Sequence, residues 1–122
     1  MDKSLKKSKI NEFLSKAQEE IIKYRKTGRF VYLQQASEKI YGAYTLLVEL
    51  LSGKELYSHI EVGRTADRLE RKYKDLDLLS DYAELLHIYF YEGKAYPERV
   101  VKVCLKAINL IRKLMLEVSK NG

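Results

Sequence analysis

Two histidines, His59 and His87, are the side chains best suited to acid–base chemistry, because imidazole titrates near neutral pH. His87 follows Leu86 and stands three residues before Phe90, at the edge of an apolar helical face. It is a candidate RNA-cleaving acid or base, or a nucleotide contact. The alternative is a half-buried histidine bonded to a backbone or tyrosine partner. Glu84, three residues earlier, shares its helix face, and contact between the two would raise the pKa of His87.

His59 lies in the segment Tyr57-Ser58-His59, with Glu61 close behind it. Ser58, His59 and Glu61 can be drawn as nucleophile, base and orienting group. The members of such triads come from separate elements, so adjacent residues are poorly placed for one. The sequence favours the other interpretation, in which Ser58 caps the following helix and His59 lies exposed beside it.

Two basic stretches are candidate nucleic-acid interfaces. The first stretch spaces Arg64, Arg68 and Arg71 at helical intervals, followed by Lys72. Asp67 and Glu70 interrupt it, which favours a solvated, ion-paired face. The second stretch has no acidic residue within it and is the better candidate; its cations are Lys102, Lys106, Arg112 and Lys113.

Other residues favour structural roles. The acidic group lacks the glycine and glutamate of a calcium loop, and helix-start carboxylates explain it more simply; its members are Asp75, Asp77, Asp81 and Glu84. The tyrosines, among them Tyr41, Tyr44, Tyr82, Tyr89 and Tyr91, could stack on bases, but beside Leu and Ile they favour a core or interface. Cys104 is predicted to be a small buried hydrophobe. No metal motif, phosphate-binding glycine loop or nucleophile elbow is present, so we expect no cofactor and no metal.

The elements that must position these residues are helices. Apolar residues recur with helical periodicity and predict helices over residues 4–26, 29–52, 62–73, from after residue 77 to residue 91, and from residue 97 onward. Residues 54–61 are predicted to connect the second and third helices. In the second helix Leu33, Ala36, Ile40, Ala43, Leu47 and Leu50 form an alternating seam for antiparallel packing. Gly42, which weakens a helix, indicates a close approach of another helix there.

Length and composition predict one domain, residues 1–122. The helical periodicity predicts that this domain is all-α, folded as an antiparallel bundle of four to five helices. The formal charge is +6, and both ends of the chain are basic while residues 29–93 are mildly acidic. We expect the lysine-rich first ten residues to fray. No apolar run is long enough for a membrane span, and no secretory signal is recognisable. With a single cysteine, this favours the cytoplasm. Abundant Lys and Glu are typical of thermophile proteins.

Two stretches resemble a known family. They are YLQQASEKIYGA at residues 32–43 and AELLHIYFYEG at residues 83–93, with Ser58-His59 between them. Together they resemble the archaeal PaREP1-type proteins, small helical proteins related to the HEPN-like superfamily, over roughly residues 30–115. The resemblance implies an antiparallel helical bundle that dimerises. It also implies one of two roles, a toxin RNase or a partner of a nucleotidyltransferase-type protein.

The RNase members of that superfamily carry an Arg a short, fixed distance before a His, and this chain departs from the pattern. The corresponding positions are Ser52, Gly53 and Lys54 before His59, and Ser80, Asp81 and Tyr82 before His87. The leading hypothesis is therefore a non-catalytic interaction module, a homodimer that docks a protein partner or nucleic acid. The alternatives are an RNA-binding bundle that uses the last helix and a toxin-type RNase with a degenerate site around His87, Tyr91 and arginines supplied across the dimer, with His59 as a separate candidate catalytic residue.

Overall fold

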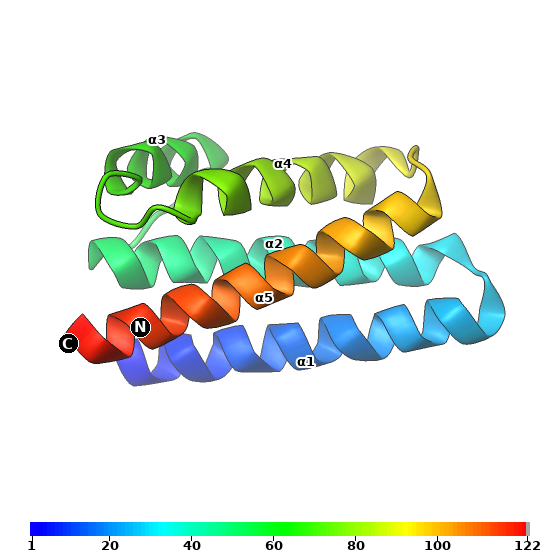
Figure 1. Ribbon diagram of the computed structural model, residues 1–122, viewed down its shortest axis with the longest axis horizontal. Coiled ribbons are helices and arrows are strands. Elements are labelled where there is room, and N and C mark those ends of the chain that lie inside the picture. The colour runs from blue at the N-terminus through cyan, green and yellow to red at the C-terminus, as the bar shows by residue number, and fades with distance from the viewer. Residues whose placement is uncertain (122) are drawn as a thin grey trace.

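The computed structural model describes the backbone of residues 1–121 and the side chains of residues 1–118. Over these residues the fold has five helices and no strand: α1 (Lys3–Thr27), α2 (Phe30–Ser52), α3 (His59–Leu69), α4 (Leu76–Glu92) and α5 (Pro97–Asn121). Helix α2 runs through the centre, with α1 below it, α4 above it and α5 crossing it obliquely (Figure 1). The shorter α3 packs against α2 and α4 at the end where α2 finishes. The predicted all-α bundle is confirmed.

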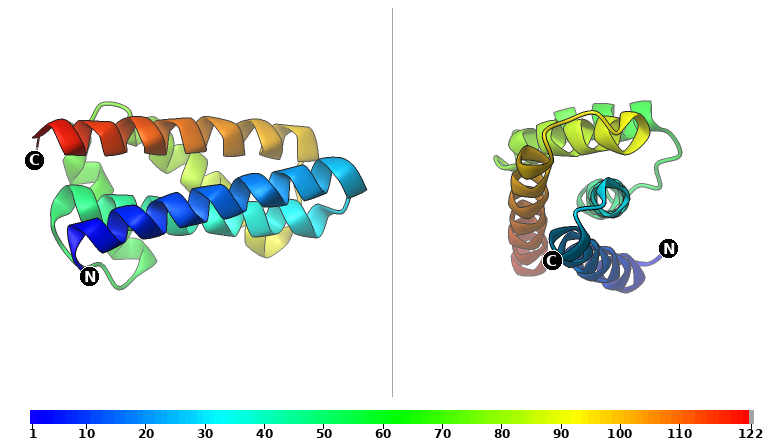
Figure 2. Two further views of the ribbon diagram at one scale, coloured as in Figure 1. Left: turned by 90° about the horizontal axis from the view of Figure 1, so that it is seen from below. Right: turned by 90° about the vertical axis from the view of Figure 1, so that its right-hand side faces the viewer.

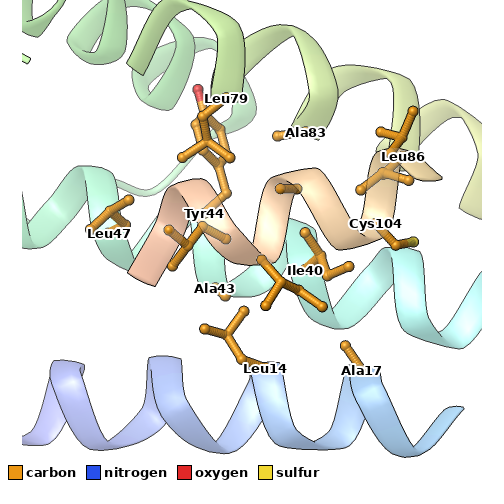
Figure 3. Close-up of a cluster of buried hydrophobic side chains, with 14 of the residues drawn as sticks. Leu14, Ala17, Ile40, Ala43, Tyr44, Leu47, Leu79, Ala83, Leu86 and Cys104 are labelled. Carbon is orange, nitrogen blue, oxygen red and sulfur yellow. The ribbon is translucent and has the colours of Figure 1, made fainter. Parts of the chain in front are cut away.

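The core forms where the periodic apolar faces meet around α2 (Figure 3). Every member of the predicted α2 seam is buried: Leu33, Ala36, Ile40, Ala43, Leu47 and Leu50. A Cβ on Gly42 would lie 3.3 Å from Cε2 of Phe13, so glycine allows α1 to approach closely at this position, as predicted. The packing of such seams supplies most of the stability of the helices, because helical propensity alone would not hold them in water.

Cys104 lies in the same core, fully buried beside α2 (Figure 3). Burial raises the pKa of its thiol to about 12, and a hydrogen bond with Ser37 offsets a small part of that rise. The thiol is therefore protonated at neutral pH and packs as the small hydrophobe that the sequence predicts. Close by, the hydroxyl of Tyr44 hydrogen-bonds to Oγ of Ser80 at 2.8 Å, which satisfies a polar group at the edge of the apolar interior.

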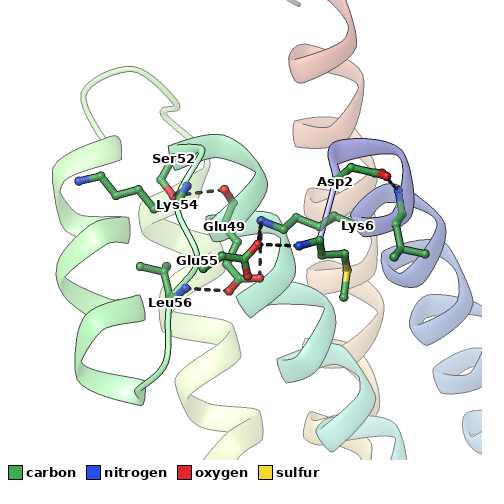
Figure 4. Close-up of polar contacts among 9 residues, drawn as sticks. Asp2, Lys6, Glu49, Ser52, Lys54, Glu55 and Leu56 are labelled. Carbon is green, nitrogen blue, oxygen red and sulfur yellow. Dashed lines mark hydrogen bonds and ion pairs between the residues drawn. The ribbon is translucent and has the colours of Figure 1, made fainter.

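The first ten residues do not fray, contrary to prediction. Asp2 caps α1 by accepting a hydrogen bond from the Leu5 amide at 2.7 Å. One turn into the helix, Lys6 is buried and its ammonium lies 3.1 Å from Glu55 Oε1 and 4.0 Å from Glu49 Oε1. These contacts tie the start of α1 to the segment after α2, which fixes the helix end in place (Figure 4).

We refer to Lys6, Glu49, Glu55 and the N-terminal amine of Met1 as the ionic cluster. The amine contacts Glu55 Oε1 at 3.1 Å, and Glu49 Oε2 accepts a hydrogen bond from the Leu56 amide at 2.8 Å. Each buried charge therefore has an oppositely charged or hydrogen-bonding partner, as buried ions require. The cluster anchors the connection between α2 and α3 from the α1 side (Figure 4).

The prediction for the third helix, residues 62–73, is wrong at both ends. The helix begins at His59 because Oγ of Ser58 caps it, accepting from the Glu61 amide at 3.1 Å. It ends at Leu69, and the next residues form turns in which the Tyr73 amide donates to the Leu69 carbonyl at 2.9 Å. Helix α4 then starts at Leu76, inside the predicted break. Over the part of the chain that the structure describes, no helix is long and apolar enough to cross a membrane.

Candidate functional site

The two histidines, 28 residues apart in the sequence, meet at the surface where α2, α3 and α4 come together. His59 is the first residue of α3, and the Ser58 cap sets the direction of that helix. His87 comes from the half-buried flank of α4 and Tyr41 from α2. We call Tyr41, His59, Glu84, His87 and Tyr91 the histidine cluster.

The rings of the histidine cluster stack on one another. The centroids of Tyr41 and His87 are 4.2 Å apart with planes tilted by 24°, and those of His59 and His87 are 4.9 Å apart at 20°. Tyr91 meets His87 edge-on at 4.9 Å and 81°. His87 is thus enclosed between rings from three helices, while the Tyr91 side chain is 73% exposed.

Hydrogen bonds orient His59 on both sides of its ring. The Tyr41 hydroxyl bonds to Nδ1, and Nε2 lies 3.1 Å from Glu84 Oε1. A hydroxyl that donates to Nδ1 leaves the ring proton on Nε2, from which it donates to the carboxylate. Tyr41, His59 and Glu84 therefore form a continuous hydrogen-bonded line from α2 through α3 to α4.

Burial and neighbouring charges set the protonation of the other groups. Burial lowers the pKa of His87, the charge of His59 lowers it further, and Glu84 opposes both. His87 is consequently neutral at pH 7. Burial, followed by the Glu84 charge, raises the pKa of Tyr41, which keeps its hydroxyl protonated and able to donate.

Two shallow hollows flank the stacked rings. One, of about 290 Å³, lies between α1, α2 and α4 and has aromatic walls that include Phe13, Phe90 and Tyr91. The other, of about 230 Å³, lies on the α3 side over Tyr57 and His59. The lysine in these linings is Lys39, whose ammonium is 3.6 Å from Glu38. The site therefore offers aromatic surface and acid–base groups, but little positive charge to hold a phosphate.

Sequence reasoning identified both histidines and Tyr91 but did not bring His59 together with the other two. The predicted partner of Glu84 was His87, on its own helix; the hydrogen bond of Glu84 instead goes to His59. The expected rise in the pKa of His87 is wrong, because burial outweighs the carboxylate. Tyr41 was weighed only as one of several tyrosines, since no spacing rule links residues on three separate helices.

The triad of Ser58, His59 and Glu61 is not formed. Ser58 accepts from the Glu61 amide, and the Glu61 carboxylate accepts from the Tyr57 amide at 2.9 Å. Both side chains stabilise the start of α3, which confirms the capping interpretation. Among the described residues, no group of three or more His, Cys, Asp or Glu side chains is arranged to hold a metal ion.

The predicted basic residues lie elsewhere. Arg64 and Arg68 are exposed on α3, but Arg71 follows the helix end, so the three do not continue one helical face. In α5, Lys102 and Lys106 line a hollow of about 770 Å³. The other two predicted cations of α5 have partners: Arg112 donates to Gln18 Oε1 at 3.1 Å, and Lys113 Nζ lies 2.7 Å from Asp75 Oδ2. None of these residues touches the histidine cluster through a described contact.

Comparison with known proteins gives one family. The sequence model of the archaeal PaREP1/PaREP8 family matches residues 9–111, which include all five members of the histidine cluster. No curated protein and no solved structure matches the chain.

Proposed function

This chain belongs to the archaeal PaREP1/PaREP8 family, and from its surface we propose that it is a non-catalytic interaction module, in its simplest form a homodimer. The observation that carries the proposal is the solvent-facing side of α4. There Leu78, Leu85 and Ile88 are 46%, 41% and 49% exposed. Together with Asp81, which lies among them in helical register, they form what we call the α4 face.

An apolar stripe on the outside of a bundle marks a site where another surface can bind. The aliphatic residues of the α4 face recur at helical spacing, so they lie along one line rather than being scattered. The exposed ring of Tyr91 extends this surface toward the histidine cluster. Tyrosine is enriched at interfaces because it combines a large apolar area with a polar tip.

The test is the solution mass by light scattering of the wild type and of Leu85→Asp combined with Ile88→Asp. We expect the wild-type mass to rise with concentration above that of one chain, and the double variant to remain a single chain. Leu5→Asp, at an equally exposed leucine on α1, is the matched control and should behave as the wild type. An unchanged mass in the double variant would remove the α4 face from the proposal.

Five more specific predictions belong to the same proposal. They are the relationship to HEPN-like proteins, a thermophilic source, the cytoplasm as compartment, a nucleotidyltransferase-type partner and RNA as a second ligand. The antiparallel bundle supports the first of these. Adding a short RNA at low and at high salt in the light-scattering experiment tests the last, because phosphate contacts release counterions and weaken as salt rises.

A second candidate function rests on one specific observation, the meeting of His59 and His87. A neutral His87 beside an oriented His59 can serve as base and acid in RNA cleavage. The scarcity of cations around the site weighs against this, because a cleaved phosphate needs stabilisation of its charge. The test is cleavage of a labelled RNA by the wild type, His87→Ala and Tyr96→Phe in nuclease-free preparations; Tyr96 is exposed and lines neither hollow of the site. Activity lost only in His87→Ala would favour the enzyme.

A further inference from the structure

Helices α1 and α5 are antiparallel neighbours on one side of the bundle (Figure 2), and two hollows lie between them. One hollow, of about 230 Å³, is lined by Gln18, Ile21, Ile22 and Arg25 from α1 and by Leu105 from α5. A second, of about 440 Å³, lies farther along and is lined by Lys7, Asn11, Arg112, Met115 and Leu116. The hydrogen bond between Gln18 and Arg112 lies between the two. A third hollow, around Lys102 and Lys106, shares Arg25 with the first. We call these three hollows together the α1–α5 groove.

The α1–α5 groove is basic. The hollow at the start of α5 contains Arg25, Arg99, Lys102 and Lys106, against a single acidic side chain, Glu98. Among the side chains that the structure describes, none of these four cations forms an ion pair. Lys7 and Arg112 add positive charge at the other end.

Its surface is also apolar along its length. Ile22, Leu105 and Leu116 are 52%, 40% and 65% exposed, although each lines one of the hollows. Leu105 and Leu116 lie on the same helix, about 16 Å apart at a rise of 1.5 Å per residue. An apolar lining flanked by cations suits an acidic amphipathic helix, whose apolar side chains would fill the hollows.

Helix α4 has the complementary properties. Between Leu76 and Glu92 it carries four acidic residues and neither lysine nor arginine. The first and last aliphatic residues of the α4 face, Leu78 and Ile88, are separated by about 15 Å along the helix, which matches the spacing of Leu105 and Leu116. The acids Asp77 and Asp81 stand next to this stripe and can meet the cations of the groove.

We propose that the α1–α5 groove binds the α4 face of a second copy of this chain. The inference rests on the proposed function, because it takes the α4 face as the docking surface and names what that face binds. Tyr82 of α4 lines the hollow around Lys102 and Lys106, but the aliphatic residues of the α4 face are exposed and line none of the three hollows, so a molecule does not fill its own groove with this face. The contact joins two different surfaces, and such head-to-tail contacts build rings or chains, so the homodimer of the proposed function is the first step of assembly and not its end.

A mixing experiment with two variants tests this arrangement. The face variant is Leu85→Asp with Ile88→Asp, and the groove variant is Lys102→Glu with Leu105→Asp. All four side chains are exposed, and circular dichroism with thermal melting checks that both variants fold like the wild type. Leu5→Asp serves again as the control.

Each variant alone should remain a single chain at concentrations where the wild type assembles. An equimolar mixture should form a one-to-one pair that does not grow, because one intact face meets one intact groove. Raising the salt concentration should dissociate the pair by screening the charges.

The outcomes that overturn the inference separate it from the proposed function. If the face variant is a single chain but the groove variant assembles like the wild type, the α4 face docks elsewhere and only this inference fails. A mixture that stays monomeric excludes head-to-tail docking. If added RNA raises the solution mass of the face variant but not that of the groove variant, the groove binds nucleic acid and not the α4 face. Normal assembly of the face variant removes the α4 face from the proposed function, and this inference with it.

Discussion

The ionic cluster and the histidine cluster hold the two sides of the same segment, the connection between α2 and α3, but they differ in how far water reaches them. In the ionic cluster the side chain of Lys6 is 6% exposed and that of Glu49 is 11% exposed. In the histidine cluster the side chains of His59 and Glu84 are 47% and 45% exposed. Both clusters contain a cationic or basic group against a carboxylate. In the ionic cluster Glu55 is 41% exposed, so the two clusters differ mainly in the burial of the basic group and of Glu49.

This difference in exposure distinguishes polar groups that hold the fold together from polar groups that are available to bind another molecule. Buried charges that find every partner fix the geometry, and removing one leaves the other uncompensated. Exposed groups can exchange their partners for water at little cost, which leaves them free to meet a ligand or another chain. We therefore expect substitutions in the ionic cluster to change stability, and substitutions in the histidine cluster to change what the surface does.

The largest expected effect is that of Lys6→Met. The substitution keeps the length of the side chain but leaves the Glu49 carboxylate buried without its cation, and we expect a loss of about 2 kcal/mol in the free energy of unfolding. Urea denaturation measures it. Lys16→Met, which removes an exposed ammonium 2.9 Å from Glu12, is the control and should leave stability almost unchanged. Equal losses in the two variants would show that burial does not distinguish the ionic cluster.

A smaller effect is expected for Tyr41→Phe. The variant keeps the stacked ring and removes only the hydroxyl that binds Nδ1 of His59, so the loss should be about 1 kcal/mol. Urea denaturation again gives the value. Tyr57→Phe, at a tyrosine that is 85% exposed, provides the comparison and should cost less. If both variants lose the same amount, the line from Tyr41 to Glu84 does not stabilise the fold.

The smallest expected effect is a dependence of stability on pH in the histidine cluster. The pKa of His87 is lower in the folded chain than its ordinary value of 6.5, so the unfolded chain binds the proton first as the pH falls. Stability from this group is therefore complete above pH 6.5 and declines as the pH falls below it. We expect the melting temperature of the wild type to drop more between pH 7 and pH 5 than that of His87→Gln.

The ionic cluster supplies the contrast for this last measurement. The hydrogen bond and charge of Lys6, together with those of the N-terminal amine, lower the pKa of Glu55, which stays ionised throughout that range. The stability that this lowered pKa contributes is nearly complete above the ordinary value of 4.5, so the ionic cluster of the wild type should add little pH dependence between pH 7 and pH 5. A His87→Gln variant whose melting temperature falls as steeply as that of the wild type would contradict the assignment.

The helices could be predicted from the sequence because each carries its apolar residues at a regular spacing, and the α2 seam is buried in full. Periodicity places the start of α3 too late, because it first becomes visible at Val62, whereas the capping role predicted for Ser58 is confirmed and marks the start at His59. The burial of Lys6 could not be predicted, since its partners Glu49 and Glu55 lie on another element. The histidine cluster was missed for the same reason: sequence spacing relates residues within one helix, whereas this site joins three.

The reaction of the Cys104 thiol with a labelling reagent can report when the core of the bundle opens. The thiol is the only one in the sequence and lies fully covered among α2, α4 and α5, with a pKa near 12. A thiol-labelling reagent must wait until the core separates, because only the uncovered thiolate reacts. When reclosing outpaces modification, the labelling rate gives the population of open molecules. The equilibrium between closed and open molecules can thus be followed without adding a probe.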